Sequence, residues 1–348
     1  MMTHPRNLLL AFCVGMLTHC AFHSTLPEEE NKMHPDSSAS AIPPLPLTFT
    51  HGSVTLSGDL SLPPGKGPFP AVVMIHGSGP QDRSNPVFKV IAEGLNRQGI
   101  ATLNYDKRGT GKSGGNFCDC TYRDLADDAL AGLRKLASLP MIDPKRIGIY
   151  GHSQGGMVAT LAGQSEGVAF VILSSAPMSP PREQVLALEK NFLKEAGVDD
   201  KGIESYADFF NFHFLSVQRG DWRGLLERYE TVKDATWLKP AKHLCPLEEV
   251  RLRAQGKVVP KDGLWDDYLN NLEFNPQAEV AKVKAPILGL YATRDFYVDV
   301  PKNKKLLDEV LSTLKQPSRS GIKEGNHSFV TINPSYIEEM GEWALGLP

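Results

Sequence analysis

Short apolar runs alternate with amphipathic helical stretches along most of this chain. The run Ala71–Ile75 is apolar at every position, which is typical of a strand buried on both faces of a parallel sheet. Strands that alternate with helices favour right-handed βαβ crossovers and helices on both faces of the sheet. The sequence therefore predicts an α/β fold with a mostly parallel central sheet. The expected strands are 71–75, 100–105, 146–150, 169–173, 286–291 and a short one near 318–323, preceded by a hairpin over 47–51 and 54–60.

This alternation is interrupted after Ala176 and returns at Pro286. Between these points, residues 178–274 contain helical patterns and no convincing strand, which indicates an inserted helical cap. The α/β core is then 47–177 together with 275–348. Helices of the core are expected at 87–98, from a capping-box-like start at Thr121 to about Leu139, and after Ser153.

Four phenylalanines stand close together in the cap segment. Phe210 and Phe214 are four residues apart and are expected to pack together on one helix face, with Phe209 and Phe212 forming a neighbouring stripe. Either both stripes bury against other cap helices, or one of them lines an acyl pocket.

The charge balance of the chain excludes one class of partner. Its 348 residues contain 37 Lys and Arg and 40 Asp and Glu, for a formal net charge of −3. A nucleic-acid-binding surface needs clustered positive charge, so we expect no nucleic-acid partner.

Residues 1–26 have the pattern of a signal peptide or lipoprotein leader. The apolar run Leu8–Leu17 suits the core of a signal peptide and is too short to span a bilayer. Leu17-Thr18-His19-Cys20 is similar to a bacterial lipobox, which makes Cys20 a candidate lipid anchor, although His19 departs from the small residue of that motif. An ordinary cleaved leader and an uncleaved apolar N-terminus are the alternatives.

Residues 27–46 are rich in Glu, Ser and Pro and are expected to form a linker. A leader followed by a linker predicts a bacterial protein that is exported, either to the periplasm or as a membrane-anchored lipoprotein, rather than a cytoplasmic one.

Three cysteines, Cys118, Cys120 and Cys245, remain after such a leader. No cysteine–histidine cluster has the spacing of a zinc site, so no metal site is predicted. In an oxidising compartment, a disulfide from Cys245 to Cys118 or Cys120 would link cap to core, and three unpaired thiols are the alternative.

The motif most specific for a function is Gly151-His152-Ser153-Gln154-Gly155-Gly156. It follows an expected strand and precedes an expected helix, which is the context of a nucleophile elbow with Ser153 at its tip. The alternative is a plain glycine-rich turn between a strand and a helix. A serine hydroxyl is a weak nucleophile unless a base takes its proton, so the motif requires a histidine elsewhere in the chain.

Chain order selects the partners of Ser153. In this arrangement the acid follows a late strand and the histidine follows the last one. Only one of the ten histidines lies beyond residue 295, and this is His327. Asp295 comes at the carboxyl end of the strand 286–291 and is the expected acid, with Asp299 as its rival.

An oxyanion hole needs backbone N–H donors. The residue after the nucleophile, Gln154, is one expected donor, and Ser78 in the loop His76–Pro80 is the other. The segment Arg108–Ser113 looks like a phosphate-binding loop, but that motif requires a glycine where this chain has Asp106.

With these residues placed, the sequence resembles the α/β-hydrolase superfamily of serine hydrolases from about Leu47 to its end. The resemblance is carried by the segments His76–Pro80, Asp106–Ser113 and Gly151–Gly156, with Asp295 and His327. The overall pattern is similar to bacterial capped esterases and to dienelactone-hydrolase-like or peptidase-like proteins. It implies hydrolysis of a carboxylic ester, or of an amide or thioester, without a metal or organic cofactor.

Together, the residues and the resemblance predict a serine hydrolase of the carboxylesterase type. It would cleave small-molecule acyl substrates through Ser153, Asp295 and His327, by way of an acyl-enzyme. Aminopeptidase-like or thioester hydrolysis on the same fold is the alternative within the class. From a different class, the alternative is a catalytically silent surface lipoprotein that binds a ligand.

Overall fold

The computed structural model describes residues 43–241, 244–259, 270–271, 273–328 and 334–347. The predicted leader, most of the predicted linker and Cys20 lie outside these residues, so export and lipidation stay predictions. Within the described part of the chain, no helix is both long and apolar enough to cross a membrane.

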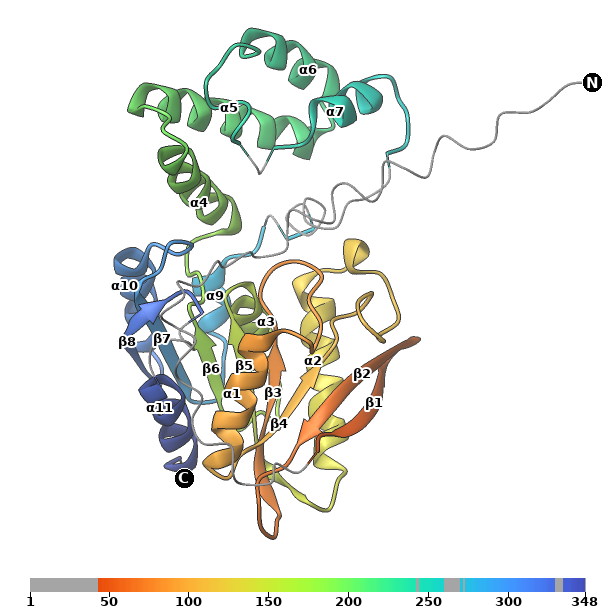
Figure 1. Cartoon of the computed structure of the whole chain (residues 1–348), viewed down its shortest axis with the longest axis vertical. Helices are drawn as coiled ribbons and strands as arrows, with labels where there is room; N and C mark the ends of the chain where they lie inside the picture. The colour runs from red at the N-terminus through yellow and green to blue at the C-terminus, as the bar shows by residue number, and fades with distance from the viewer. Residues whose placement is uncertain (1–42, 242–243, 260–269, 272, 329–333, 348) are drawn as a thin grey trace, which may run out of the picture. The chain divides into compact units, whose positions relative to one another are not determined.

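An eight-stranded sheet forms the centre of the core, as the apolar runs predict (Figure 1). Its strand order is β1-β2-β4-β3-β5-β6-β7-β8. The hairpin β1–β2 pairs antiparallel, β2 joins β4 antiparallel, and all other neighbours are parallel. The strands are β1 (Leu45–His51), β2 (Val54–Ser61), β3 (Phe69–Ile75), β4 (Ala101–Tyr105), β5 (Ile142–His152), β6 (Val171–Ser174), β7 (Ile287–Arg294) and β8 (Arg319–Asn326).

Helices cover both faces of this sheet because its strands are apolar on both sides. In β3, Ala71, Val73 and Ile75 join one hydrophobic core, and Val72 and Met74 join the other. The first core includes α2 (Tyr122–Ala137), α3 (Gln154–Ala162) and α10 (Val300–Leu311), and the second includes α1 (Pro86–Arg97) and α11 (Pro334–Leu345). Shorter helices are η2 (Phe117–Asp119) and α9 (Pro276–Val280).

The start of α2 shows how local sequence sets an element boundary. Thr121 Oγ1 accepts from the Asp124 N–H at 3.2 Å, and the Asp124 carboxylate accepts from the Thr121 N–H at 2.8 Å. This reciprocal pair is the capping box that the sequence predicts at Thr121.

Between β6 and β7 the chain forms the helices α4 (Pro181–Glu195), α5 (Asp200–Arg219), α6 (Trp222–Thr231) and α7 (Leu247–Ala254), which we call the helical insertion. These helices share a hydrophobic core of their own. Phe210 packs on Phe214 with ring centroids 5.7 Å apart, as predicted, and Phe209 packs on Tyr229. The prediction for Phe212 was wrong, because this side chain is 37% exposed and lies under the Arg228 guanidinium.

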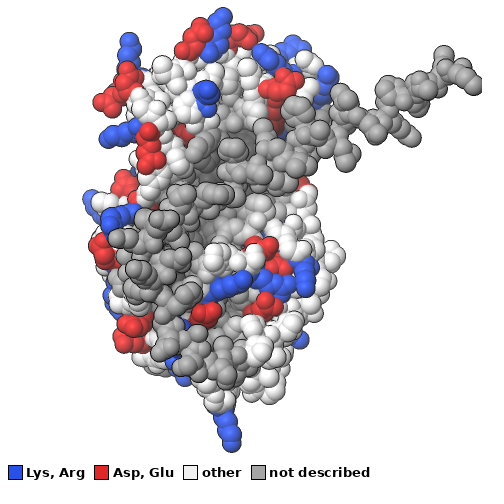
Figure 2. All heavy atoms as spheres, in the orientation of Figure 1, with Lys and Arg blue, Asp and Glu red and all other residues white. Residues whose placement is uncertain are grey.

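Charged groups of both signs cover the helical insertion and the core. On the face shown in Figure 2, Lys and Arg side chains lie among Asp and Glu side chains, with uncharged surface between these groups. The three described cysteines, Cys118, Cys120 and Cys245, form no disulfide, so the proposed link between Cys245 and the core is absent from this structure.

A histidine inside the helical insertion should make the protein sensitive to acid. Burial lowers the pKa of His213 to about 3, from an ordinary value of 6.5. Between these values the unfolded chain binds a proton that the folded chain does not, so the free energy of unfolding falls as the pH is lowered. At pH 5 this one group should cost about 2 kcal/mol relative to pH 7.5.

Urea unfolding at pH 7.5 and pH 5 checks this expectation in the wild type and in His213→Gln. A glutamine oxygen can replace His213 Nε2 as acceptor for the Cys245 N–H. The variant should lose less stability between the two pH values than the wild type. An unchanged difference would mean that His213 titrates alike in the folded and unfolded states.

Candidate active site

Ser153 stands at a sharp turn between β5 and α3. Its backbone has φ 54° and ψ −123°, in a region that side chains with a Cβ rarely occupy. The Ser153 N–H donates to Ser174 O at 2.8 Å, and Ser153 O accepts from the Gly156 N–H at 2.9 Å. The turn therefore has the strained geometry of a nucleophile elbow, with the N-terminus of α3 directly after the serine.

Two glycines make this turn possible. A Cβ on Gly151 would lie 2.1 Å from Gly155 O, and a Cβ on Gly155 would lie 2.4 Å from Ile75 O. No side chain fits at either position, because strand β5, helix α3 and the end of β3 approach one another through their backbones. The Gly-x-Ser-x-Gly spacing is thus required by the local packing.

His327 and Asp295 form a buried pair. His327 Nδ1 lies 2.8 Å and 2.7 Å from the two carboxylate oxygens of Asp295, whose side chain is fully buried. Asp295 Oδ1 also accepts from the backbone N–H groups of Tyr297 and Val298. Burial raises the pKa of Asp295, but the hydrogen bond and charge of His327 outweigh this and hold the pKa below its usual value. Asp295 is therefore ionised and accepts the Nδ1 proton.

Asp299 has a different place. It is the N-cap of α10, and its carboxylate accepts from the Lys302 N–H at 3.1 Å. The structure thus pairs Asp295 with His327 and uses Asp299 to start a helix.

The ring of His327 lies beside the elbow. It packs against the ring of His152, which directly precedes Ser153, with centroids 4.8 Å apart, and against Tyr297 at 4.9 Å. Burial, followed by the charge of His327, lowers the pKa of His152 to about 3, so its ring is neutral. No hydrogen bond joins Ser153 to His327 in the described part of the chain. Such bonds are often long without substrate.

The loop after β3 lies against Ser153. A Cβ on Gly77 would be 3.4 Å from Ser153 Cβ, a normal contact distance, so this loop runs directly beside Ser153. The next residue, Ser78, has its carbonyl bound by Gln81 Nε2 at 2.7 Å. Its N–H makes no hydrogen bond within the described residues. Gln154, the other expected donor, begins α3 and is buried.

Lys107 is a residue of this site that the sequence analysis did not find. Its side chain is almost fully buried, and its Nζ donates to Gly77 O and to Gly79 O, the latter at 3.0 Å. These carbonyls stand on either side of Ser78. Lys107 therefore fixes the peptide groups that flank the expected oxyanion donor.

The turn after β4 closes around an acidic side chain. The Asp106 carboxylate accepts from the N–H groups of Arg83 and Lys112 at 3.0 Å and 2.8 Å. A Cβ on Gly111 would lie 2.5 Å from this carboxylate. The segment that looks like a phosphate-binding loop is thus folded around its own anion.

Two pockets flank helix α4. One, of about 290 Å³, is lined by Ala187 and Asn191 of α4 and by residues 293–301, including Asp295. The other, of about 420 Å³, is lined from α4 by Arg182, Glu183 and Leu186. No group of His, Cys, Asp or Glu among the described residues is arranged to hold a metal ion.

Comparisons with known proteins find similarity to hydrolases. The family model described as serine aminopeptidase, S33, matches residues 67–209. The esterase EstD of Thermotoga maritima is 33% identical over 162 residues, which are 44% of this chain and 38% of the esterase. The match thus covers well under half of that protein's length.

Solved structures match over most of the chain. Proline iminopeptidase from Mycobacterium smegmatis aligns with TM-score 0.57 and 15% identity, over 86% of this chain and 98% of that chain. Est1E from Butyrivibrio proteoclasticus, with ferulic acid bound, aligns with TM-score 0.56 and 17% identity, over 86% and 98%. The sheet order and these matches agree, and the chain has the fold of the α/β hydrolases.

Proposed function

We propose that this protein is a serine hydrolase of the carboxylesterase type. The observation that carries the proposal is the buried Asp295–His327 pair, with the His327 ring packed beside the elbow that holds Ser153. A nucleophile, a base and an orienting acid within one site are the elements that acyl transfer requires.

The reaction follows from the roles of these atoms. Ser153 Oγ attacks the ester carbonyl while His327 Nε2 accepts its proton, and the backbone N–H groups of Ser78 and Gln154 stabilise the oxyanion. His327 then gives the proton to the departing alkoxide, which leaves as the alcohol. Water attacks the acyl-enzyme, His327 takes its proton and returns it to Ser153 Oγ, and the acid is released.

A fluorophosphonate probe tests this proposal directly. An activated serine displaces fluoride and becomes phosphonylated, and peptide mapping identifies the labelled residue. Labelling of Ser153 that is lost in Ser153→Ala supports the enzyme. Absence of labelling in folded wild-type protein would favour the silent binding protein instead.

Amide hydrolysis is the second candidate, because the matching family model is described as a serine aminopeptidase. The Glu273 carboxylate lines the larger pocket, where it accepts from Gln218 Nε2 and would attract a substrate amine. Comparing p-nitrophenyl esters with aminoacyl p-nitroanilides decides between these candidates. Faster cleavage of the anilides would make the protein an aminopeptidase-like enzyme.

Replacing Lys107 by methionine should lower kcat and leave KM nearly unchanged. The apolar side chain fills the space but releases Gly77 O and Gly79 O, so the Ser78 N–H loses its fixed direction. Loss of one oxyanion donor costs about 10²–10³ in kcat, and a misdirected donor should cost about 10-fold or more.

Steady-state kinetics on a p-nitrophenyl ester measures this change, with Lys112→Met as the matched control. Lys112 lies on the same turn, and its side chain is exposed. A kcat for Lys107→Met equal to that of the control would show that the lysine has no part in shaping the donor loop.

A further inference from the structure

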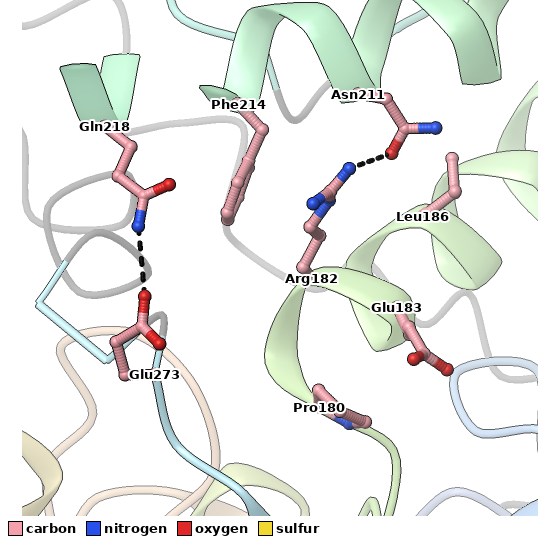
Figure 3. Close-up of a pocket in the computed structure, with 8 residues that line it drawn as sticks. All are labelled: Pro180, Arg182, Glu183, Leu186, Asn211, Phe214, Gln218 and Glu273. Carbon is pink, nitrogen blue, oxygen red and sulfur yellow. Dashed lines mark hydrogen bonds between the residues drawn. The ribbon is translucent and has the colours of Figure 1, made fainter. Parts of the chain in front are cut away.

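The larger pocket contains an arginine whose bonding partners in the protein are neutral. Figure 3 shows the Arg182 side chain between Asn211, Phe214 and Leu186. Its Nη2 donates to Asn211 Oδ1 at 2.5 Å, and its guanidinium lies over the Phe214 ring, 5.6 Å from the centroid. No carboxylate lies within ion-pair distance of Arg182 in the described part of the chain, so no acidic side chain described there neutralises its charge.

The two carboxylates that line the same pocket are held by other groups. Glu183 forms an ion pair with Lys302 at 2.9 Å, and in Figure 3 its carboxylate lies apart from the Arg182 guanidinium. Glu273 accepts from Gln218 Nε2 at 3.0 Å, across the pocket from Arg182. Neither carboxylate therefore neutralises the arginine.

The segment that carries Glu273 is bound to residues near Ser153. Asn271, two residues before Glu273, accepts from the Tyr122 N–H at 2.7 Å. Phe274 packs on the Tyr122 ring, and the Tyr122 hydroxyl accepts from Gln154 Nε2 at 3.4 Å. The chain on either side of Glu273 is thus held, through Tyr122, by the residue that follows Ser153.

We infer that this pocket binds the part of the substrate farthest from the reacting bond, and that this part ends in a carboxylate held by Arg182. The inference rests on the proposed function, because it adds the substrate class to that site. Pro180, Leu186 and Phe214 give the pocket an apolar side suited to a short aliphatic chain, and about 420 Å³ is enough for a small organic group. The substrate is then an ester of an aliphatic compound with a terminal carboxylate.

A carboxylate fits this pocket better than a phosphate. A guanidinium offers two parallel N–H donors, which match the two oxygens of one carboxylate. A phosphate dianion would bring a second negative charge toward the lining carboxylates Glu183 and Glu273. The single available cation therefore suits a monoanionic group.

Binding without turnover provides the first test. Ser153→Ala protein is titrated calorimetrically with glutarate and with its neutral analogue glutaramide. Glutarate should bind the more tightly, and adding Arg182→Gln should weaken glutarate binding about 10-fold or more, as expected for a charge-assisted hydrogen bond. Adding Arg182→Lys, which keeps the charge but not the planar fork, should weaken it less.

The matched control is Arg219→Gln, which removes the same charge from an exposed position at the end of α5. Circular dichroism and thermal melting of each variant establish that it is folded. If Arg182→Gln binds glutarate as the control does, Arg182 only ties α4 to α5 through Asn211, and the inference fails.

Turnover provides the second test. The ratio of kcat/KM for mono-p-nitrophenyl glutarate to that for p-nitrophenyl pentanoate compares a terminal carboxylate with a terminal methyl group. This ratio should fall about 10-fold in Arg182→Gln and stay unchanged in Arg219→Gln. If neither ester is cleaved but glutarate binding still depends on Arg182, the proposed function fails and the carboxylate site stands. If both esters are cleaved with a ratio insensitive to Arg182, the site fails and the hydrolase stands.

Discussion

Ser153→Ala should abolish ester hydrolysis and leave the protein folded. The variant lacks the only atom that can form the acyl-enzyme, and removal of the nucleophile from a comparable triad costs about 10⁶ in kcat. Alanine keeps a Cβ in the same strained backbone region (φ 54°), so the turn and its stability should change little. Steady-state hydrolysis of p-nitrophenyl butyrate measures the loss.

The matched control is Ser138→Ala. Ser138 is exposed after the last turn of α2, and its hydroxyl donates only to Lys135 O. The control should have wild-type activity. Full activity in Ser153→Ala would remove this serine from the mechanism, whatever the shape of the turn.

Asp295→Asn should cost about 10⁴ in kcat. The amide cannot stabilise an imidazolium, and its NH₂ group favours the tautomer of His327 that carries the proton on Nε2, the atom that must act as base. Asp299→Asn is the matched control, because asparagine replaces aspartate well as the N-cap of α10. It should change neither activity nor stability by much.

Kinetics of the two asparagine variants under identical conditions measures the difference. A larger loss in Asp299→Asn than in Asp295→Asn would reverse the assignment. An equal, small loss in both would mean that His327 works without an orienting carboxylate.

The sequence predicted the fold class because the strands of a parallel sheet are recognisable one at a time. Runs such as Ala71–Ile75 are apolar at every position, since helices cover both faces of the sheet. The turn that holds Ser153 was equally recognisable, because backbone contacts require its glycines at the positions where the motif has them.

The different roles of Asp295 and Asp299 could have been predicted from the residues that follow Asp299. Asp299 stands immediately before Val300-Pro301, and a proline in the first turn of a helix marks the residue ahead of that turn as a cap. Asp295, which directly follows β7, instead comes from the sheet edge at which parallel strands end.

The roles of Lys107, Arg182 and Phe212 could not be predicted in the same way. Each depends on a partner far along the chain: Lys107 on the loop after β3, Arg182 on α5, and Phe212 on α6. The periodicity of apolar residues predicts which face of a helix is buried. It does not predict which residue, distant in the sequence, contacts a given side chain.

Helix α4 contributes residues to both pockets, and this has a consequence for altering specificity. Arg182 and Leu186 of α4 line the larger pocket. Ala187 and Asn191, on a neighbouring face of the same helix, line the pocket that includes Asp295. A substitution that shifts α4 should therefore change both pockets. Mutations in α4 that are selected for a new substrate would then also disturb the surroundings of Asp295. Asn211, Phe214 and Gln218 of α5 line only the larger pocket. A library directed at α5 should therefore change substrate preference with a smaller loss of catalytic rate than one directed at α4.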